Sequence, residues 1–202
     1  MKLLGVSGTI VGAKTAVLVN TTLEKIKEKN PHIDIEFLDL RNYNMEFSDG
    51  RPVKEYNNDT QEIITKMLEA DFYLLGTPVF NGSIPAPLKN LFDLIPPLAL
   101  RHKVIGIVAN GGTYQHHLMV ENQLKPITGY LRAFTTPSYV YAQNSHFDSN
   151  NRIVDKDLLA RISNLADELL HMQFQLGTYP VVKEKSELQT IYSTETRRMK
   201  SG

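Results

Sequence analysis

The feature that most constrains the fold is a regular alternation of short apolar runs with longer amphipathic stretches. The apolar runs have the length of strands, and the amphipathic stretches repeat their apolar residues at helical spacing. This pattern predicts strands over residues 2–6, 33–37, 71–76, 103–109 and 138–142. It predicts helices over residues 13–29, 59–69, 85–95, 115–134 and 155–174, and an irregular segment over 39–58.

Strands that alternate with helices predict an α/β fold with a five-stranded, parallel, doubly wound sheet, because parallel neighbours need a crossover connection. Right-handed crossovers place helices on both faces of such a sheet. In segment 33–37 apolar and acidic residues alternate, which is typical of an edge strand, whereas segment 103–109 is uniformly apolar and should be covered on both faces. Ligands of these sheets bind beyond the carboxyl ends of the strands.

Two local signals refine the helices. Pro126 and Gly129 should kink or split the helix over 115–134, because proline lacks the N–H that the preceding turn needs. Asp59 is the expected N-cap of the helix over 59–69, with Glu62 at the capping-box position.

Composition excludes several classes of protein. The chain has 202 residues, 22 Lys+Arg against 22 Asp+Glu, and no Cys, so disulfide scaffolds, cysteine nucleophiles and thiolate metal sites are excluded. Balanced charge predicts no nucleic-acid partner, and apolar runs far below the roughly 20 residues of a membrane span predict no membrane partner. We therefore expect a cytoplasmic protein with one domain over residues 1–176 and a polar C-terminal extension over 177–202.

Three loops should meet at the carboxyl edge of the sheet. The first, SGTIVGAKT at 7–15, leads into a helix, and its glycines, hydroxyls and lysine suit a phosphate at the helix N-terminus. It matches neither the Walker pattern nor GxGxxG. The others are GTPVFNGSIP at 76–85 and ANGGTY at 109–114. Each loop alone is also explained as an ordinary turn, with Ser or Thr capping the helix in the first case.

Two of these loops resemble a known family. The run TPVFNGSIP at 77–85, followed by LKNLFD at 88–93, resembles the flavin-loop signature of the NAD(P)H-dependent FMN reductases of flavodoxin-like fold and related azoreductases. The run GGT at 111–113, with His116, Leu118 and LKP at 124–126, resembles the branch that serves alkanesulfonate monooxygenases. The resemblance covers residues 1–172. It implies FMN as cofactor, NADPH or NADH as hydride donor, a homodimer or homotetramer, and a flavin-dependent monooxygenase as a candidate partner.

The resemblance also assigns site residues. It gives the FMN phosphate to Thr9, Lys14, Thr15 and Ala16. It places the isoalloxazine ring between two loops, formed by Pro78, Val79, Phe80, Asn81, Gly82 and Ser83 on one side and by Asn110, Gly111, Gly112 and Thr113 on the other.

The chain departs from the family pattern at three places. Val11 stands where the phosphate loop often has Arg, so phosphate affinity should rest on amides, hydroxyls and Lys14. Asn122 stands where sulfonate-linked members can carry a bulge-forming Tyr, and the tail after Gly177 is longer than the family core requires.

In the family, hydride passes from nicotinamide C4 to flavin N5, so no side-chain acid or base is expected. Amides of residues 81–83 or 110–112 are suited to stabilise negative charge on the reduced ring. The electrons would pass to free flavin, a monooxygenase, quinones or azo compounds. Two alternatives remain at this stage: an FMN electron carrier, against which the neutral charge argues, and a non-catalytic binding domain.

Other reactive side chains carry no clear site. His116 and His117 are adjacent and point about 100° apart on a helix, so they do not chelate one metal ion, and no metal site is expected. Ser7 and Ser83 lack the GxSxG context of a hydrolase nucleophile. Arg51, Arg101 and Lys103 are candidates for a nicotinamide 2′-phosphate, among which the sequence does not choose.

Overall fold

A parallel sheet forms the centre of the protein. The computed structural model describes residues 1–176. Its strands are β1 (Lys2–Ser7), β2 (Asp34–Asp39), β3 (Phe72–Pro78), β4 (Val104–Gly111), β5 (Phe134–Thr135) and β6 (Val140–Gln143). The strand order is β2-β1-β3-β4-β5, β6 also pairs with β4, and all pairings are parallel. The predicted parallel sheet is confirmed, and so is the edge position of segment 33–37, because β2 ends the order.

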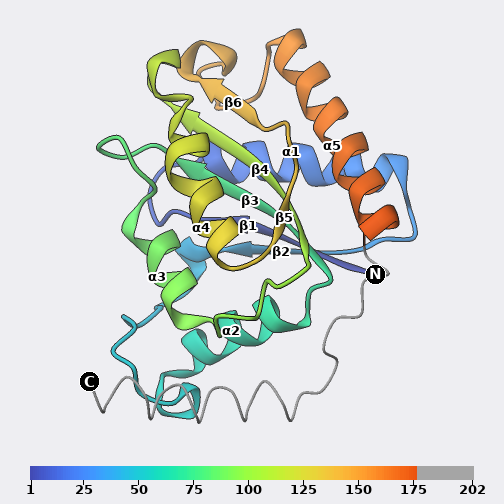
Figure 1. The fold of residues 1–202 in the computed structure, drawn as a ribbon. Coiled ribbons are helices and arrows are strands. Elements are labelled where there is room, and N and C mark those ends of the chain that lie inside the picture. The colour runs from blue at the N-terminus through green and yellow to red at the C-terminus, as the bar shows by residue number, and fades with distance from the viewer. Residues whose placement is uncertain (177–202) are drawn as a thin grey trace.

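Helices cover both faces of this sheet (Figure 1). On one face α1 (Lys14–Lys29) and α5 (Lys156–Leu176) pack together over an apolar layer that includes Leu3, Leu74 and Val108. On the other face α2 (Asn58–Glu69), α3 (Ala86–Leu94) and α4 (Lys125–Tyr130) pack over a second layer. Within residues 1–176 no helix has the length and apolar character needed to cross a bilayer.

The edge of the sheet next to β4 differs from the prediction, because two short strands, β5 and β6, lie where one was expected. Segment 115–134 is predicted to be a helix that Pro126 and Gly129 kink or split. The structure has a 3-10 turn (Tyr114–His116), a π-helical turn (Val120–Leu124) and then α4, which begins one residue before Pro126. The helix ends at Tyr130, because Arg132 takes a left-handed conformation with φ of 60°. The chain then forms β5, and β6 continues the same edge after Pro137, which cannot donate a ladder hydrogen bond.

The cap of α2 also differs from the prediction. Asn57, not Asp59, is the N-cap, and its Oδ1 accepts the N–H of Thr60 at 2.8 Å. Asp59 instead accepts the N–H of Asn44 at 2.7 Å, which ties the irregular segment after β2 to the helix. Sequence alone does not separate two capping residues two positions apart.

The strand order fixes where a ligand site can form. The chain runs from β1 outward to β2 and then crosses back to β3, so the order reverses between β1 and β3. Loops on the two sides of such a switch point diverge and leave a crevice at the carboxyl ends of the strands. The loops after β1, β3 and β4 all lie at this edge (Figure 1).

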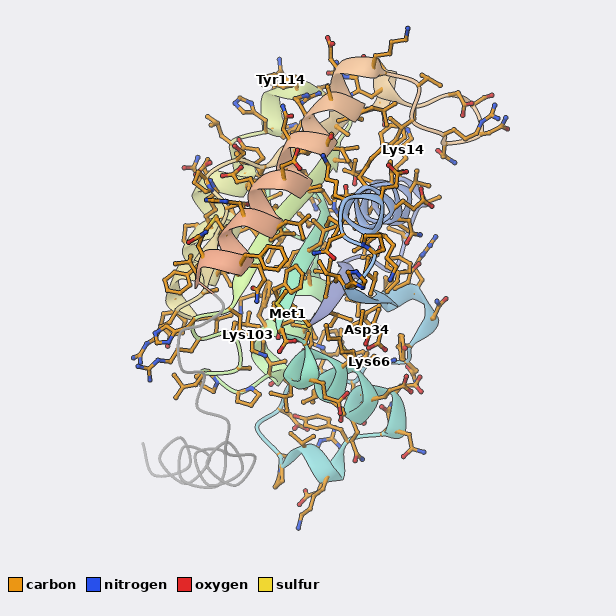
Figure 2. All side chains as sticks on the ribbon, turned by 90° about the vertical axis from the view of Figure 1, so that its right-hand side faces the viewer. Met1, Lys14, Asp34, Lys66, Lys103 and Tyr114 are labelled. Atoms are coloured by element: carbon orange, nitrogen blue, oxygen red, sulfur yellow. The ribbon has the colours of Figure 1, made fainter. Side chains whose placement is uncertain are left out.

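Lys103 is a buried cation at the opposite edge. It precedes β4, is 8% exposed, and Figure 2 shows it near Met1 and far from Lys14 and Tyr114. Its Nζ donates to the carbonyls of Ala70 and, at 3.4 Å, Leu68, at the carboxyl end of α2. Burial lowers the pKa of Lys103 from 10.5 to about 8, and the charge of Asp71 opposes this shift.

This pKa predicts a pH-dependent stability. Between pH 8 and 10.5 the unfolded chain keeps a proton on Lys103 that the folded protein has released, so the free energy of unfolding should rise with pH across this window. The rise is at most about 3 kcal/mol. Urea unfolding of the wild type and of Lys103→Met near pH 8 and near pH 10 tests it. The wild type should gain stability relative to the variant, whereas an unchanged difference would contradict the pKa.

Candidate functional site

The first loop is tightly built at its beginning. Gly8 donates its N–H to the carbonyl of Gly76 at 2.8 Å, and a Cβ on Gly8 would lie 2.8 Å from that oxygen and 2.9 Å from Leu88. Thr9 is 1% exposed, and its Oγ1 donates to the Val11 carbonyl and accepts the Val11 N–H. Gly8 therefore allows the loop to pack closely against the end of β3, and Thr9 stabilises the turn that follows.

The N-terminus of α1 has no side-chain cap. Its N-cap residue is Ala13, and the first turn contains no acidic residue. In the described part of the chain the amides of Lys14, Thr15 and Ala16 have no hydrogen-bond acceptor. The alternative of a Ser- or Thr-capped helix is thus not what the structure has, and three aligned donors at the positive end of a 16-residue helix remain for an anion.

A buried hydroxyl lies below this turn. Ser7 is fully buried at the end of β1, and its Oγ has no hydrogen-bond partner among the described residues. Ser7 pairs in register with Gly76, and a Cβ on Gly76 would point at Thr15 and Val19 of α1. Residues in register on neighbouring strands face the same side, so the Ser7 hydroxyl faces the beginning of α1.

Hydrogen bonds bring the predicted loops together. Thr15 Oγ1 donates to Oδ1 of Asn110 at 2.7 Å, which joins α1 to the end of β4. Val79 donates its N–H to the Asn110 carbonyl at 2.8 Å, which joins the loop after β3 to the same residue. Lys14 reaches a fourth segment, because its Nζ donates to Oδ1 of Asn144 at 2.7 Å and lies 5.5 Å from the ring centre of Phe147.

The second loop is a tight turn with a free tip. Phe80 and Ser83 exchange two backbone hydrogen bonds of 3.0 Å around Asn81 and Gly82. Both central residues have positive φ, 51° and 78°, as a type I′ turn requires. A Cβ on Gly82 would meet nothing within 4 Å, so the space beside the tip is open. Pro78 is buried at the end of β3, whereas Phe80 is exposed.

The two glycines of the third loop differ in the space beside them: Tyr141 packs against Gly111, whereas the space beside Gly112 is open. A Cβ on Gly111 would lie 2.1 Å from the hydroxyl of Tyr141, so this glycine is needed for packing. A Cβ on Gly112 would meet nothing within 4 Å. Burial raises the pKa of Tyr141, and its protonated hydroxyl donates to the Thr113 carbonyl at 2.7 Å.

An aromatic group borders the third loop. Tyr114 stacks on His117 with 4.6 Å between ring centres and meets Tyr141 edge-on at 6.0 Å. His117 Nδ1 lies 3.0 Å from the carbonyl of Tyr114. In residues 1–176 no three His, Cys, Asp or Glu side chains gather as metal ligands would.

The three candidates for a nicotinamide 2′-phosphate lie in different places. Lys103 is buried at the opposite edge of the sheet, as described above, and Arg101 lies two residues before it. The Arg51 guanidinium is 4.4 Å from the ring centre of Tyr56 and pairs with Asp49 and Glu46, all within the segment after β2. The structure therefore brings none of them to the three loops.

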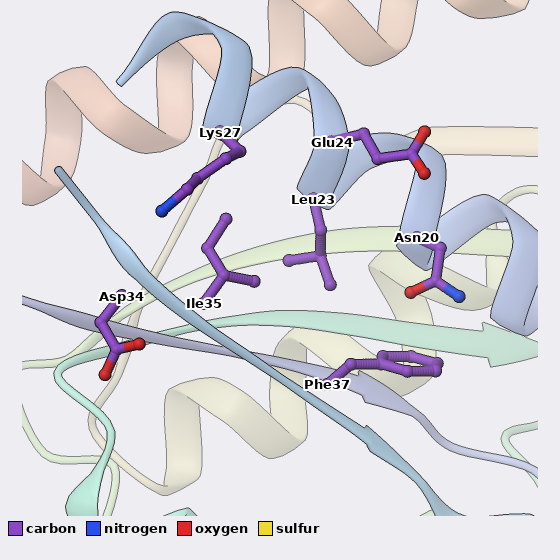
Figure 3. Close-up of a pocket in the computed structure, with 7 residues that line it drawn as sticks. All are labelled: Asn20, Leu23, Glu24, Lys27, Asp34, Ile35 and Phe37. Atoms are coloured by element: carbon purple, nitrogen blue, oxygen red, sulfur yellow. The ribbon is translucent and has the colours of Figure 1, made fainter. Parts of the chain in front are cut away.

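A shallow groove of about 340 Å³ lies elsewhere, between α1 and the edge strand β2 (Figure 3). Its floor is formed by Leu23, Ile35 and Phe37, and polar side chains flank it. None of the predicted site residues lines this groove.

Sequence reasoning missed one charged residue at the site. Arg41 follows β2, and its Nη1 donates to the carbonyl of Gly12 in the first loop at 2.9 Å. The available signal was its position just after the strand next to β1, since the carboxyl ends of paired parallel strands lie together.

Comparison with known proteins adds an independent finding. Residues 1–147 match the sequence profile of a family described as NADPH-dependent FMN reductase. An NAD(P)H-dependent FAD/FMN reductase of Geobacillus thermodenitrificans is 54% identical over 176 residues, which cover 87% of this chain and 95% of that protein. An FMN reductase (NADPH) of Pseudomonas aeruginosa is 34% identical over 167 residues, covering 82% of this chain and 89% of the relative.

Solved structures agree on the fold. An apo form of the NADH:FMN oxidoreductase EMOB superposes with a TM-score of 0.74 at 20% identity and covers 89% of this chain and 91% of that one. A flavodoxin of Streptococcus pneumoniae superposes with a TM-score of 0.55 at 15% identity, covering 84% and 97%. The flavodoxin-like fold expected from the sequence is confirmed.

Proposed function

The chain belongs to the NADPH-dependent FMN reductase family, and on that premise we propose that it holds FMN at the carboxyl edge of β1, β3 and β4. It is an oxidoreductase that uses NADPH or NADH and FMN. The family resemblance drawn from the sequence is thereby confirmed. The positions of the cofactor and of its contacts are our proposal.

The observation that carries the proposal is the uncapped N-terminus of α1. The 5′-phosphate of FMN would accept hydrogen bonds from the amides of Lys14, Thr15 and Ala16, which lack an acceptor in the described chain. The Ser7 hydroxyl, which has no partner within residues 1–176, faces the same turn. Lys14 adds positive charge there, whereas Thr9 shapes the loop through its own turn.

The isoalloxazine ring would lie between the second and third loops. Open space at Gly82 and Gly112 supports this placement, because both positions leave room beside the backbone. The Asn110 carbonyl fixes the spacing of the two loops through Val79. The remaining contacts would come from Pro78, Phe80, Asn81, Ser83, Gly111 and Thr113.

When bound, FMN would supply the hydride chemistry of the reaction with the nicotinamide. The task of this chain is then to orient the ring and to present donors to it. The amides of Asn81 and Gly82 at the turn tip are suited to stabilise negative charge on the ring, a fixed electrostatic contribution that needs no side-chain acid or base.

Replacing Gly112 by alanine tests the ring placement. The added methyl group has open space in the free protein, so the free energy of unfolding should change by less than about 0.5 kcal/mol. With the ring in place the same methyl group would collide with it, so FMN and riboflavin should both bind about tenfold more weakly. Flavin fluorescence titration measures both affinities. Unchanged binding of both flavins would place the ring elsewhere.

The activity itself is tested by following NADPH and NADH oxidation with and without added FMN. We expect turnover that depends on FMN and a reduced flavin that passes electrons to oxygen, quinones or azo dyes. No turnover with either nicotinamide, by protein that binds FMN, would contradict the reductase function and favour an electron carrier.

The proposal extends to the surroundings of the site. We take residues 1–176 as the reductase domain; the predicted extension 177–202 lies outside the described residues.

Phe80, Tyr114 and Leu118 are 41%, 55% and 51% exposed near the proposed site, which supports a homodimer or homotetramer that covers them. A flavin-dependent monooxygenase is the proposed recipient of reduced flavin, and a cytoplasmic location is part of the same proposal. Light scattering that shows a monomer at all concentrations would contradict the oligomer.

A further inference from the structure

Arg41 links the end of β2 to the loop that begins α1. Ser7 and Asp39 pair in register at the carboxyl ends of β1 and β2, which brings the residues after both strands together. From there Arg41 Nη1 donates to the carbonyl of Gly12 at 2.9 Å, across 29 positions of sequence. Gly12 itself has φ of 76°, so this carbonyl belongs to a turn that few other residues could form.

A buried carboxylate holds Arg41 in this orientation. Asp39 is 4% exposed, and its oxygens accept the Arg41 backbone N–H at 3.1 Å and Nε at 2.9 and 3.0 Å, as well as a bond from Nη2. A guanidinium bound along one edge by a carboxylate has a fixed plane, so the direction of its other nitrogen is set. That nitrogen is the one that contacts the first loop.

This arrangement has a consequence for an anion at α1. A carbonyl oxygen carries partial negative charge, and in a mobile loop the Gly12 carbonyl could turn toward the anion that the next three amides bind. Arg41 keeps it bonded elsewhere, so the carbonyl dipole does not oppose an anion at the amides. Lys14 keeps its full charge, because its partner Asn144 is neutral, whereas Arg41 is ion-paired with Asp39. The contribution of Arg41 is therefore to hold the turn.

We propose that Arg41, fixed by Asp39, is a positioning residue for the FMN phosphate: it holds the Gly12 turn in the conformation that presents the first-turn amides of α1. The inference rests on the proposed function, since it concerns the same phosphate. It means that the affinity of this protein for flavin phosphate depends on a residue just after β2 that contacts the loop, and not on the loop alone.

The test compares FMN with riboflavin, which lacks the phosphate, by fluorescence titration of the full chain. The wild type should bind FMN about 100-fold more tightly than riboflavin, as several charge-assisted hydrogen bonds would provide. Arg41→Gln should reduce FMN affinity about tenfold and leave riboflavin affinity within about twofold. Arg41→Lys, which keeps a donor without the fork, should fall between the two proteins.

Arg51 provides a matched control. It stands two residues after Asp49 and makes the same local bonds, N to Oδ1 and Nε to Oδ1, both at 3.1 Å, but its guanidinium contacts only its own segment. Arg51→Gln should leave both flavin affinities unchanged. Circular dichroism and thermal unfolding establish that each variant is folded.

The outcomes distinguish failure of the phosphate site from failure of the role proposed for Arg41. If the wild type does not distinguish FMN from riboflavin, the proposed phosphate site fails. If the wild type distinguishes them but Arg41→Gln does so equally well, the phosphate site stands and the role of Arg41 is overturned. A variant that loses both flavins equally would also overturn it, because Arg41 would then support the fold and not the phosphate.

Discussion

Replacing Ala13 by aspartate is expected to weaken FMN binding about 100-fold without lowering the stability of the free protein. Ala13 precedes the first turn of α1, where no acidic residue is present. A carboxylate there interacts favourably with the helix dipole, so the free protein should keep its stability. The same carboxylate would stand next to the proposed phosphate, and two negative charges about 4 Å apart near a protein surface repel by up to about 4 kcal/mol.

Asparagine at the same position separates charge from size. Ala13→Asn adds a side chain of nearly the same shape without charge. Both Asn and Asp can accept a hydrogen bond from the first-turn amides, so FMN affinity should fall in Ala13→Asn as well, but much less than in Ala13→Asp. Riboflavin should bind alike to all three proteins. Titration of each protein with both flavins gives these values, and an FMN affinity of Ala13→Asp equal to that of the wild type would show that no phosphate lies at this turn.

The second large effect concerns stability. Gly76→Ala should lower the free energy of unfolding by about 3 kcal/mol or more, because the new Cβ would lie 2.2 Å from Val19 and 3.1 Å from the carbonyl of Val6. Neither the helix α1 nor the neighbouring strand can retreat without opening the core. Displacement of α1 would also move Thr15, whose Cγ2 would be 3.3 Å from the added atom, so FMN binding should fall as well.

Urea unfolding measures this loss, and Gly112→Ala serves as the control because its methyl group enters open space. An unfolding free energy for Gly76→Ala equal to that of the wild type would mean that α1 does not pack on β3 as described.

The central strands and the three loops could be predicted because their signals are local. The apolar runs that became β1, β3 and β4 read as strands from their own residues, and a parallel sheet places the loops after them at one edge. The bonds from Thr15 and Val79 to Asn110 show that this edge is continuous.

The rest depends on contacts between distant residues. The short strand β5 begins at the last residue of the segment predicted as a helix, and it forms because Phe134 and Thr135 pair with Val104 and Ile105. The π-helical turn at Val120–Leu124 forms although Asn122 stands where sulfonate-linked members can carry a bulge-forming Tyr. The position of Arg41 just after a strand is its one local signal, and its contact is not predictable from it, since its partner is a backbone carbonyl 29 residues earlier.

Amide chemical shifts of the ¹⁵N-labelled protein, followed during addition of FMN and separately of riboflavin, test the central claim most directly. We predict that FMN shifts the amides of Lys14, Thr15 and Ala16 together with those of Gly82 and Gly112, and that riboflavin shifts the two glycines but not the first turn of α1. A response to FMN that leaves this turn unchanged, and appears instead in the groove at Asn20, Leu23 and Phe37, would contradict the account.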